Sequence, residues 1–176
     1  GWRIPFLASI ALLALGTFIR SRLPETPVFE RMKATDSFSN NPVGEAVGKN
    51  FKTFLTAVGL KLSEVSWVYM LTVFVVVYAT TNLALPKQSL LDAVMYAALF
   101  ELITLPMFGW LSDKIGRRPL FILGAIFTMA FAFPLFWMLE TKSIAMVTTA
   151  IIIAMNFGHG MMFGLESTYF PELFGP

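Results

Sequence analysis

Cysteine is absent from this sequence of 176 residues, and histidine occurs once. The chain therefore has neither a disulfide framework nor a thiolate metal site, and its redox compartment cannot be inferred. Charged residues are also scarce, at 14% of the chain. A water-soluble domain of this length needs more polar side chains than that to cover its surface. These absences argue against a soluble domain.

Apolar sequence takes the place of the missing charge. Hydrophobic residues make up 56% of the chain, 18 residues are phenylalanine, and the mean hydropathy is +0.70. A helix that spans a bilayer needs about 20 apolar residues. Five runs approach or exceed that length: residues 4–19, 54–85, 93–111, 120–139 and 144–165. We therefore expect an all-α protein of the lipid bilayer with about five transmembrane helices.

The second run is too long for one simple span. Its 32 residues would extend about 48 Å at about 1.5 Å per residue, against a hydrocarbon core of about 30 Å. We expect this run either to begin as an interfacial segment near Lys52 or to loosen around residues 80–82.

The basic residues lie between the apolar runs and form no stripe along a polar helix, so nucleic-acid binding is not indicated. Alternating spans place residues 20–53 and 112–119 on one side of the membrane. These two segments hold nine Lys or Arg residues, against Lys87 and Lys142 in the connections on the other side. The positive-inside rule predicts that the basic side is cytoplasmic. Residues 20–53 are polar and contain three prolines, which is typical of a linker between domains.

The short turn "GWLSDKIGRRP" concentrates charge between the third and fourth runs. Gly109 and Gly116 permit close backbone approach and positive φ, and Asp113 can cap the helix that follows. Arg117 and Arg118 can reach carboxylates or helix C-termini. The turn is either a conformational latch or a topology anchor, and an anchor would not need this spacing of Gly, Asp and Pro.

The same turn resembles the G-x-L-x-D-[RK]-x-G-R-R-[PR] loop of the major facilitator superfamily. The segments "GWRIPF", "LPETPVFERMKA", "FPLFWML" and "YFPELF" resemble its metabolite:proton symporters. The segment "FGLES" departs from that family, which more often shows Gly-Pro-Gln there.

The resemblance implies a partial twelve-helix bundle, comprising about the sixth to tenth helices. Residues 1–19 would be the last helix of the N-terminal bundle, residues 20–53 the central cytoplasmic linker, and residues 54–176 the first four helices of the C-terminal bundle. Since the chain begins at Gly1 without an initiator Met, we expect an internal fragment whose partners include the missing helices of the same protein.

Ionisable residues inside the apolar runs are candidates for function, because charge is costly in a membrane. Lys61 and Glu64 can pair one turn apart, on a face shared with Tyr78 and Asn82. This pair either lines a cavity or lies at the interface. Glu101 is near the middle of its run and has no cation one turn away. It is therefore either a proton carrier or a permanently protonated group hydrogen-bonded to a neighbouring helix.

The fifth run carries polar residues on one helical arc. Asn156, His159, Phe163 and Glu166 fall within about 80° of one another at about 100° per residue. His159 is either a packing residue or a proton relay. Gly160 and Gly164, beside this arc, would permit close helix packing.

Residue patterns typical of enzyme active sites are not found in the sequence. The sequence shows no Ser-His-Asp set, no paired catalytic carboxylates, no phosphate loop and no metal cluster, so we predict no enzyme, no metal and no cofactor. The resemblance implies instead a proton-coupled symporter of a small metabolite, such as an organic acid or zwitterion, that works by alternating access in the cell inner membrane. The alternatives are a sugar porter or drug:proton antiporter of the same superfamily, or a non-transporting membrane scaffold.

Overall fold

The computed structural model describes residues 3–23, 30, 44, 47–48 and 50–174, and within them it contains helices and no strands. The chain divides into two compact units, residues 1–42 and 43–176. The all-α expectation is confirmed. Most of the expected linker, including most of the segment "LPETPVFERMKA", lies outside the described residues.

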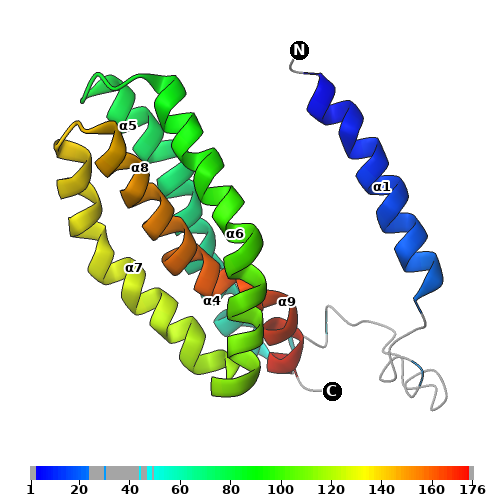
Figure 1. Cartoon of the computed structure of the whole chain (residues 1–176). Helices are drawn as coiled ribbons and strands as arrows, with labels where there is room; N and C mark the ends of the chain where they lie inside the picture. The colour runs from blue at the N-terminus through cyan, green and yellow to red at the C-terminus, as the bar shows by residue number, and fades with distance from the viewer. Residues whose placement is uncertain (1–2, 24–29, 31–43, 45–46, 49, 175–176) are drawn as a thin grey trace. The chain divides into compact units, whose positions relative to one another are not determined.

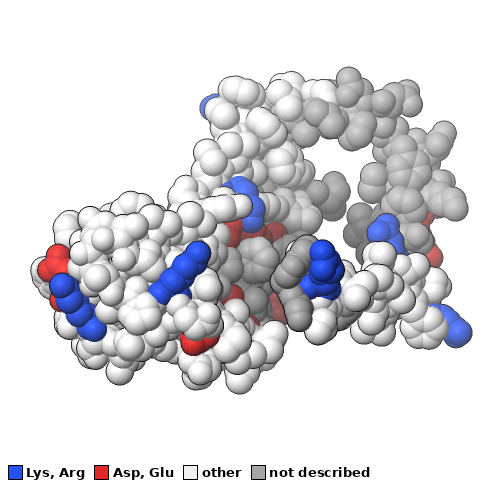
Figure 2. Space-filling model, turned by 90° about the horizontal axis from the view of Figure 1, so that it is seen from above, with Lys and Arg blue, Asp and Glu red and all other residues white. Residues whose placement is uncertain are grey.

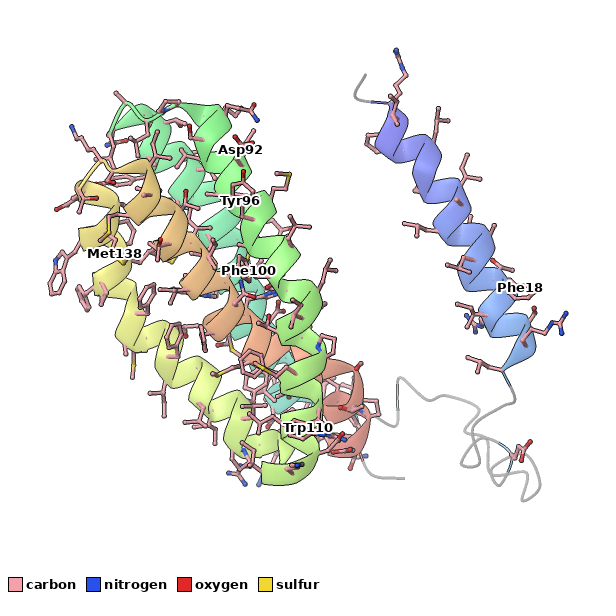
Figure 3. All side chains as sticks on the ribbon, in the orientation of Figure 1. Phe18, Asp92, Tyr96, Phe100, Trp110 and Met138 are labelled. Atoms are coloured by element: carbon pink, nitrogen blue, oxygen red, sulfur yellow. The ribbon has the colours of Figure 1, made fainter. Side chains whose placement is uncertain are left out.

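The described residues of the first unit include the helix α1 (Ile4–Arg22), which covers the first apolar run (Figure 1). Arg20 and Arg22 occupy its last turn, and the Arg22 guanidinium lies 5.3 Å from the centre of the Phe18 ring, a residue labelled in Figure 3. A cation suits a helix C-terminus, where the unpaired carbonyls carry partial negative charge. The crossing of a membrane by α1 stays a prediction.

Residues 50–174 of the second unit form four long helical rods (Figure 1). The first comprises α4 (Phe51–Tyr69), the π-helix η1 (Met70–Val75) and α5 (Val76–Thr81). Then come α6 (Lys87–Ile115) and α7 (Arg117–Glu140). The last rod comprises α8 (Ile144–Ile153), the π-helix η2 (Ala154–His159) and α9 (Gly160–Phe174). All four rods are long and apolar enough to cross a membrane.

The over-long second run loosens where the sequence suggested, because its helix begins at Phe51 and ends at Thr81, and residues 82–86 are not helical. The sequence did not predict the wide turns at Met70–Val75, inside the same helix. A π turn inserts an extra residue into the helix, so the angle of 100° per residue does not hold across it. The shared face predicted for Lys61, Glu64, Tyr78 and Asn82 is therefore wrong: Tyr78 packs on Phe136, and Asn82 is exposed.

One buried stripe orients α6. Leu90, Ala93, Ala97, Glu101 and Phe108 are buried at spacings of three, four or seven residues, the period of one helix face. This face packs on α8, η2 and α9, and the last rod lies between α6 and α7 (Figure 1). Glu101 thus belongs to the packed face of α6.

The outer surface is apolar. Tyr96, Phe100 and Trp110 project from the other sides of α6 and are about half exposed (Figure 3). Such a surface suits lipid rather than water. Figure 2 looks down on the molecule from the top of Figure 1, and there blue and red side chains stand among the white ones.

Glycines set the distance between α6 and the last rod, as the sequence predicted for Gly160 and Gly164. A Cβ atom on Gly164 would lie 3.0 Å from the carbonyl oxygen of Leu105, and one on Gly160 would lie 3.6 Å from the Phe108 ring. A backbone carbonyl cannot rotate away as a flexible side chain can. The two helices can approach this closely only because residue 164 has no side chain.

We expect Gly164→Ala to lower the unfolding free energy by about 1–3 kcal/mol, because its methyl group overpacks this contact. Gly59→Ala is the matched control, since a Cβ there meets nothing within 4 Å. Thermal unfolding of the full-length protein in detergent compares the two variants. Equal unfolding temperatures would show that the close contact carries no stability.

Candidate functional site

Ionisable groups that the sequence scatters over three runs meet inside the second unit. Glu64, Glu101, His159 and Glu166 are all buried, with 2–8% of each residue exposed. Together with Lys61 they form what we name the buried charge cluster. α4 supplies two of these residues, α6 supplies one, and η2 and α9 supply the others.

His159 bridges two carboxyl groups. Its Nε2 lies 3.0 Å from Oε1 of Glu64, and its Nδ1 lies 2.7 Å from Oε1 of Glu101. Each of these contacts requires a hydrogen, because two lone pairs facing each other repel. A neutral imidazole supplies one N–H. The two contacts together therefore require one proton more than a neutral imidazole and two ionised carboxylates hold.

Lys61 joins the outer end of the cluster. Its Nζ donates to Oε2 of Glu64 at 2.6 Å and to Oε2 of Glu166 at 2.7 Å. The Lys61 side chain is 43% exposed, whereas that of Glu64 is 2% exposed. The predicted Lys61–Glu64 pair is confirmed, and its carboxylate points inward. A continuous path of ionisable groups thus leads from an exposed ammonium to buried Glu101.

Glu101 has a hydrogen-bonding partner on another helix. The sequence offered no cation within one turn of its own helix, but His159, 58 residues further along the chain, approaches it from η2. The hydrogen bond to a neighbouring helix, which was one of the two expectations for Glu101, is present, whereas its protonation and its role as a proton carrier stay predictions. Periodicity within one run cannot identify a partner on another helix.

Asn156 fastens η2 to α6. Its Oδ1 accepts from Thr104 at 2.6 Å, and its Nδ2 donates to the carbonyl oxygens of Ala97 at 3.2 Å and Ile152 at 3.0 Å. Both amide ends are therefore used in packing. Of the predicted site residues, Asn156 is the one that the structure assigns to helix association.

Trp67 was missed by the sequence analysis. Its Nε1 donates to the carbonyl oxygen of Ala154 at 2.9 Å, which ties α4 to η2. Its position three residues after Glu64 in the same helix was the available signal, since an indole in an apolar run needs an acceptor when it is buried.

An open pocket of about 580 Å³ borders the cluster. It lies among α4, α6 and α9. Its walls are formed by Lys61, Leu105, Pro106, Gly109, Phe163, Gly164, Glu166, Ser167 and Phe170. Two aromatic rings, an ammonium and a carboxylate thus face one hollow, a composition typical of small-molecule sites.

The charged turn, residues 112–119, centres on Arg117. The guanidinium donates to Oδ1 of Asp113 at 2.7 Å, to Oγ of Ser112 at 2.6 Å and to Oε1 of Glu172 at 3.0 Å. The expected capping role of Asp113 is wrong, because α7 has no side-chain cap and Asp113 pairs with Arg117 instead. Glu172, which closes this network from α9, was not predicted.

The remaining residues of the turn take separate positions. Gly116 has φ +96° and ψ 149°, a conformation that glycine alone adopts readily, as predicted for this turn. A Cβ on Gly109 would lie 3.4 Å from the Gly164 carbonyl. Arg118 points to a different hollow, beside Thr56 and Tyr169.

Comparison with known proteins gives one consistent family. A family model described as Major Facilitator Superfamily matches residues 1–176. The shikimate transporter of Escherichia coli K12 is 33% identical over 177 residues, which cover 99% of this chain and 40% of that protein. The proline/betaine transporter of Salmonella typhimurium is 28% identical over 186 residues, which cover 97% of this chain and 37% of that protein. No solved structure gives a significant match.

The inner membrane metabolite transport protein YhjE of E. coli K12 is 28% identical over 181 residues, covering 99% of this chain and 40% of that protein. The chain therefore spans about two fifths of the length of these relatives. Family and relatives are transporters rather than enzymes, in agreement with the sequence.

The bridging contacts of His159 predict a strong coupling between two substitutions. His159→Phe leaves carboxyl oxygens of Glu64 and Glu101 without their donor, and an uncompensated buried charge costs about 3–5 kcal/mol. Adding Glu101→Gln removes one of those charges, so the double variant should unfold at a higher temperature than His159→Phe alone. The measurement is a double-mutant cycle of thermal unfolding on the full-length protein, with Glu101→Gln as the second single variant. Additive losses would mean that the two side chains do not interact.

Proposed function

This chain belongs to the major facilitator superfamily, and we propose that its full-length protein is a proton-coupled symporter of a small metabolite. The coarser part of this statement, a multi-pass membrane protein related to metabolite transporters, follows from the four apolar rods and the family match. The coupling, the direction and the placement in a cell inner membrane are our proposal.

The extra proton in the buried charge cluster supports the coupling. His159 contacts Glu64 and Glu101 at hydrogen-bonding distance, and both contacts are satisfied only when the three groups share two hydrogens. Loss of one proton would leave a lone pair facing a lone pair in a buried site. We infer that the cluster has two arrangements, one with this proton and one without it.

The exposed end of the cluster links its two protonation arrangements to the pocket, where substrate would bind. Glu64 is bonded both to His159 and to Lys61, and Lys61 faces the open pocket. A change in proton occupancy at the imidazole therefore changes the charge balance around the ammonium. In alternating access, a site near the membrane midplane is exposed first to one side and then to the other.

The orientation is part of the proposal. Arg117 at the start of α7 bonds to Glu172 near the end of α9, so the charged turn and that helix end lie at the same end of the second unit. With Lys52 at the start of α4, this end is the basic one. We propose that it faces the cytoplasm together with residues 20–53.

The alternative functions differ in which features of the site would have a role. A non-transporting scaffold would have no need of a buried proton-sharing cluster, which is costly in a membrane. A sugar porter would have no need of an ammonium and a carboxylate at the pocket. A drug:proton antiporter could use the same proton, so only the direction of proton movement separates it from a symporter.

Glu101→Gln tests the coupling. The amide can donate to Nδ1 of His159 from its NH₂ group, so the contact is satisfied without the extra proton. We expect the variant to lose at least about 90% of the substrate accumulation driven by a pH gradient, while exchange of substrate down its own gradient persists. Both activities are measured with the full-length protein in proteoliposomes.

Asp92→Asn is the matched control, since Asp92 is a partly exposed carboxylate on the same helix and its side chain contacts only Gln88 among the described hydrogen bonds. It should accumulate substrate normally. If Glu101→Gln still concentrates substrate in response to the imposed gradient, Glu101 is a structural group, and the coupling must use other residues.

The charged turn is proposed to act as a latch between access states. Because the Asp113 side chain is 62% exposed, its pair with Arg117 adds little static stability. Asp113→Asn should therefore cut the transport rate at least about tenfold with little change in abundance, if the contact is made in one state and lost in another. Glu140→Gln, at the opposite end of α7, serves as the control. Normal transport by Asp113→Asn at normal abundance would reduce the turn to a topology anchor.

A further inference from the structure

One buried polar atom in the second unit takes part in none of the contacts described above. Oε1 of Glu166 is buried and has no hydrogen-bond partner, the one such side-chain oxygen or nitrogen among the described residues. The residue as a whole is 8% exposed, and its other oxygen, Oε2, is held by Lys61. A buried acceptor without a donor is destabilising, so such an atom calls for a ligand.

Lys61 presents the complementary group in the same hollow. An ammonium has three N–H donors. Lys61 donates one to Glu64 and one to Glu166, which leaves one without a hydrogen-bond acceptor, and its Nζ also lies 5.4 Å from the centre of the Phe163 ring. The Lys61 side chain is 43% exposed, and both Lys61 and Glu166 line the open pocket. A cationic donor and a carboxylate acceptor therefore lie side by side, joined through Oε2 of Glu166.

The walls limit the size and character of what can bind. Phe163 and Phe170 supply apolar surface, and Ser167 adds one hydroxyl. The volume of about 580 Å³ lies in the range of small-molecule sites. The Phe163 ring also stacks on His159, with ring centres 4.9 Å apart, so the wall of the pocket touches the proton-sharing group.

We propose that this pocket binds a small carboxylate that also carries an O–H or N–H donor, such as a hydroxy acid or an amino acid. The carboxylate takes the free N–H of Lys61, and the donor satisfies Oε1 of Glu166. The inference rests on the proposed transport function and names the substrate class of its site. Carboxylates without a donor, including fully methylated ammonium compounds, leave Oε1 unsatisfied and bind more weakly.

The binding test uses two probe pairs in which methyl groups replace the hydrogens of the donor. One is L-proline with N,N-dimethyl-L-proline, and the other is shikimate with its tri-O-methyl ether. Binding to the purified full-length protein is measured by calorimetry in detergent. We expect a parent compound to bind at least about tenfold more tightly than its donor-free derivative, since a buried acceptor is left unpaired by the derivative. The methyl ester of the same parent should also lose affinity, because it removes the anion that Lys61 binds.

Glu166→Gln converts the acceptor into a donor with little change in shape. The single carbonyl oxygen of the amide is claimed by the Lys61 ammonium, so the NH₂ group takes the place of Oε1. A donor then faces the donor of the substrate, and the tenfold preference for the parent compound should disappear. Glu140→Gln, a carboxylate loss at the far end of α7, should keep the preference.

Three results would overturn the inference: equal affinities within both pairs, a preference that persists in Glu166→Gln, or no saturable binding of either parent. A Glu166→Gln protein that fails to fold leaves the wild-type comparison decisive. Uptake in proteoliposomes separates this inference from the proposed function. Tight, donor-dependent binding with uptake that ignores the pH gradient would refute the proton coupling alone, whereas gradient-driven uptake of the donor-free compounds would refute the subsite alone.

Discussion

A single imidazole between two carboxyl groups is the contact on which the interior of the second unit depends. His159 reaches Glu64 on α4 and Glu101 on α6 from its own place in η2, so one side chain fixes three helices relative to one another. Within a membrane, where lipid is as apolar as the helices, interhelical hydrogen bonds add to van der Waals packing in holding helices together. The polar bridge therefore adds specificity to the packing, and its two contacts together need two hydrogens.

Short side chains are what allow the bridge to close. The backbone of the last rod approaches α6 at Gly164, and Ala93 and Ala97 continue the same thin face of α6 toward Glu101. Larger residues there would move the helices apart and lengthen the contact of 2.7 Å between Nδ1 and the Glu101 carboxyl. Close packing and charge pairing are thus two aspects of one arrangement.

The sequence predicted the elements better than their partners. Hydropathy located each of the four rods of the second unit, and the spacing of Lys61 and Glu64 predicted their pair. Periodicity within single helices could not predict the contact between Glu101 and His159, because that contact spans 58 residues and depends on how two helices pack. The buried stripe of small residues beside Glu101 was a usable signal, since it marks the face that meets another helix.

The periodicity of the sequence could not predict the π-helices. They lie in the two rods that carry most of the buried charge cluster. The rod of α4 and the rod of α9 each contain one, whereas α6 and α7 contain none. Wide turns disturb the regular pairing of backbone carbonyls and are frequent at functional sites. Here the Ala154 carbonyl receives the indole N–H of Trp67, so the irregular backbone of η2 is bonded to α4 beside Glu64. Separating these two rods would break the indole bond, the Lys61–Glu166 pair and the imidazole contact together, which makes the irregular turns part of the cluster they adjoin.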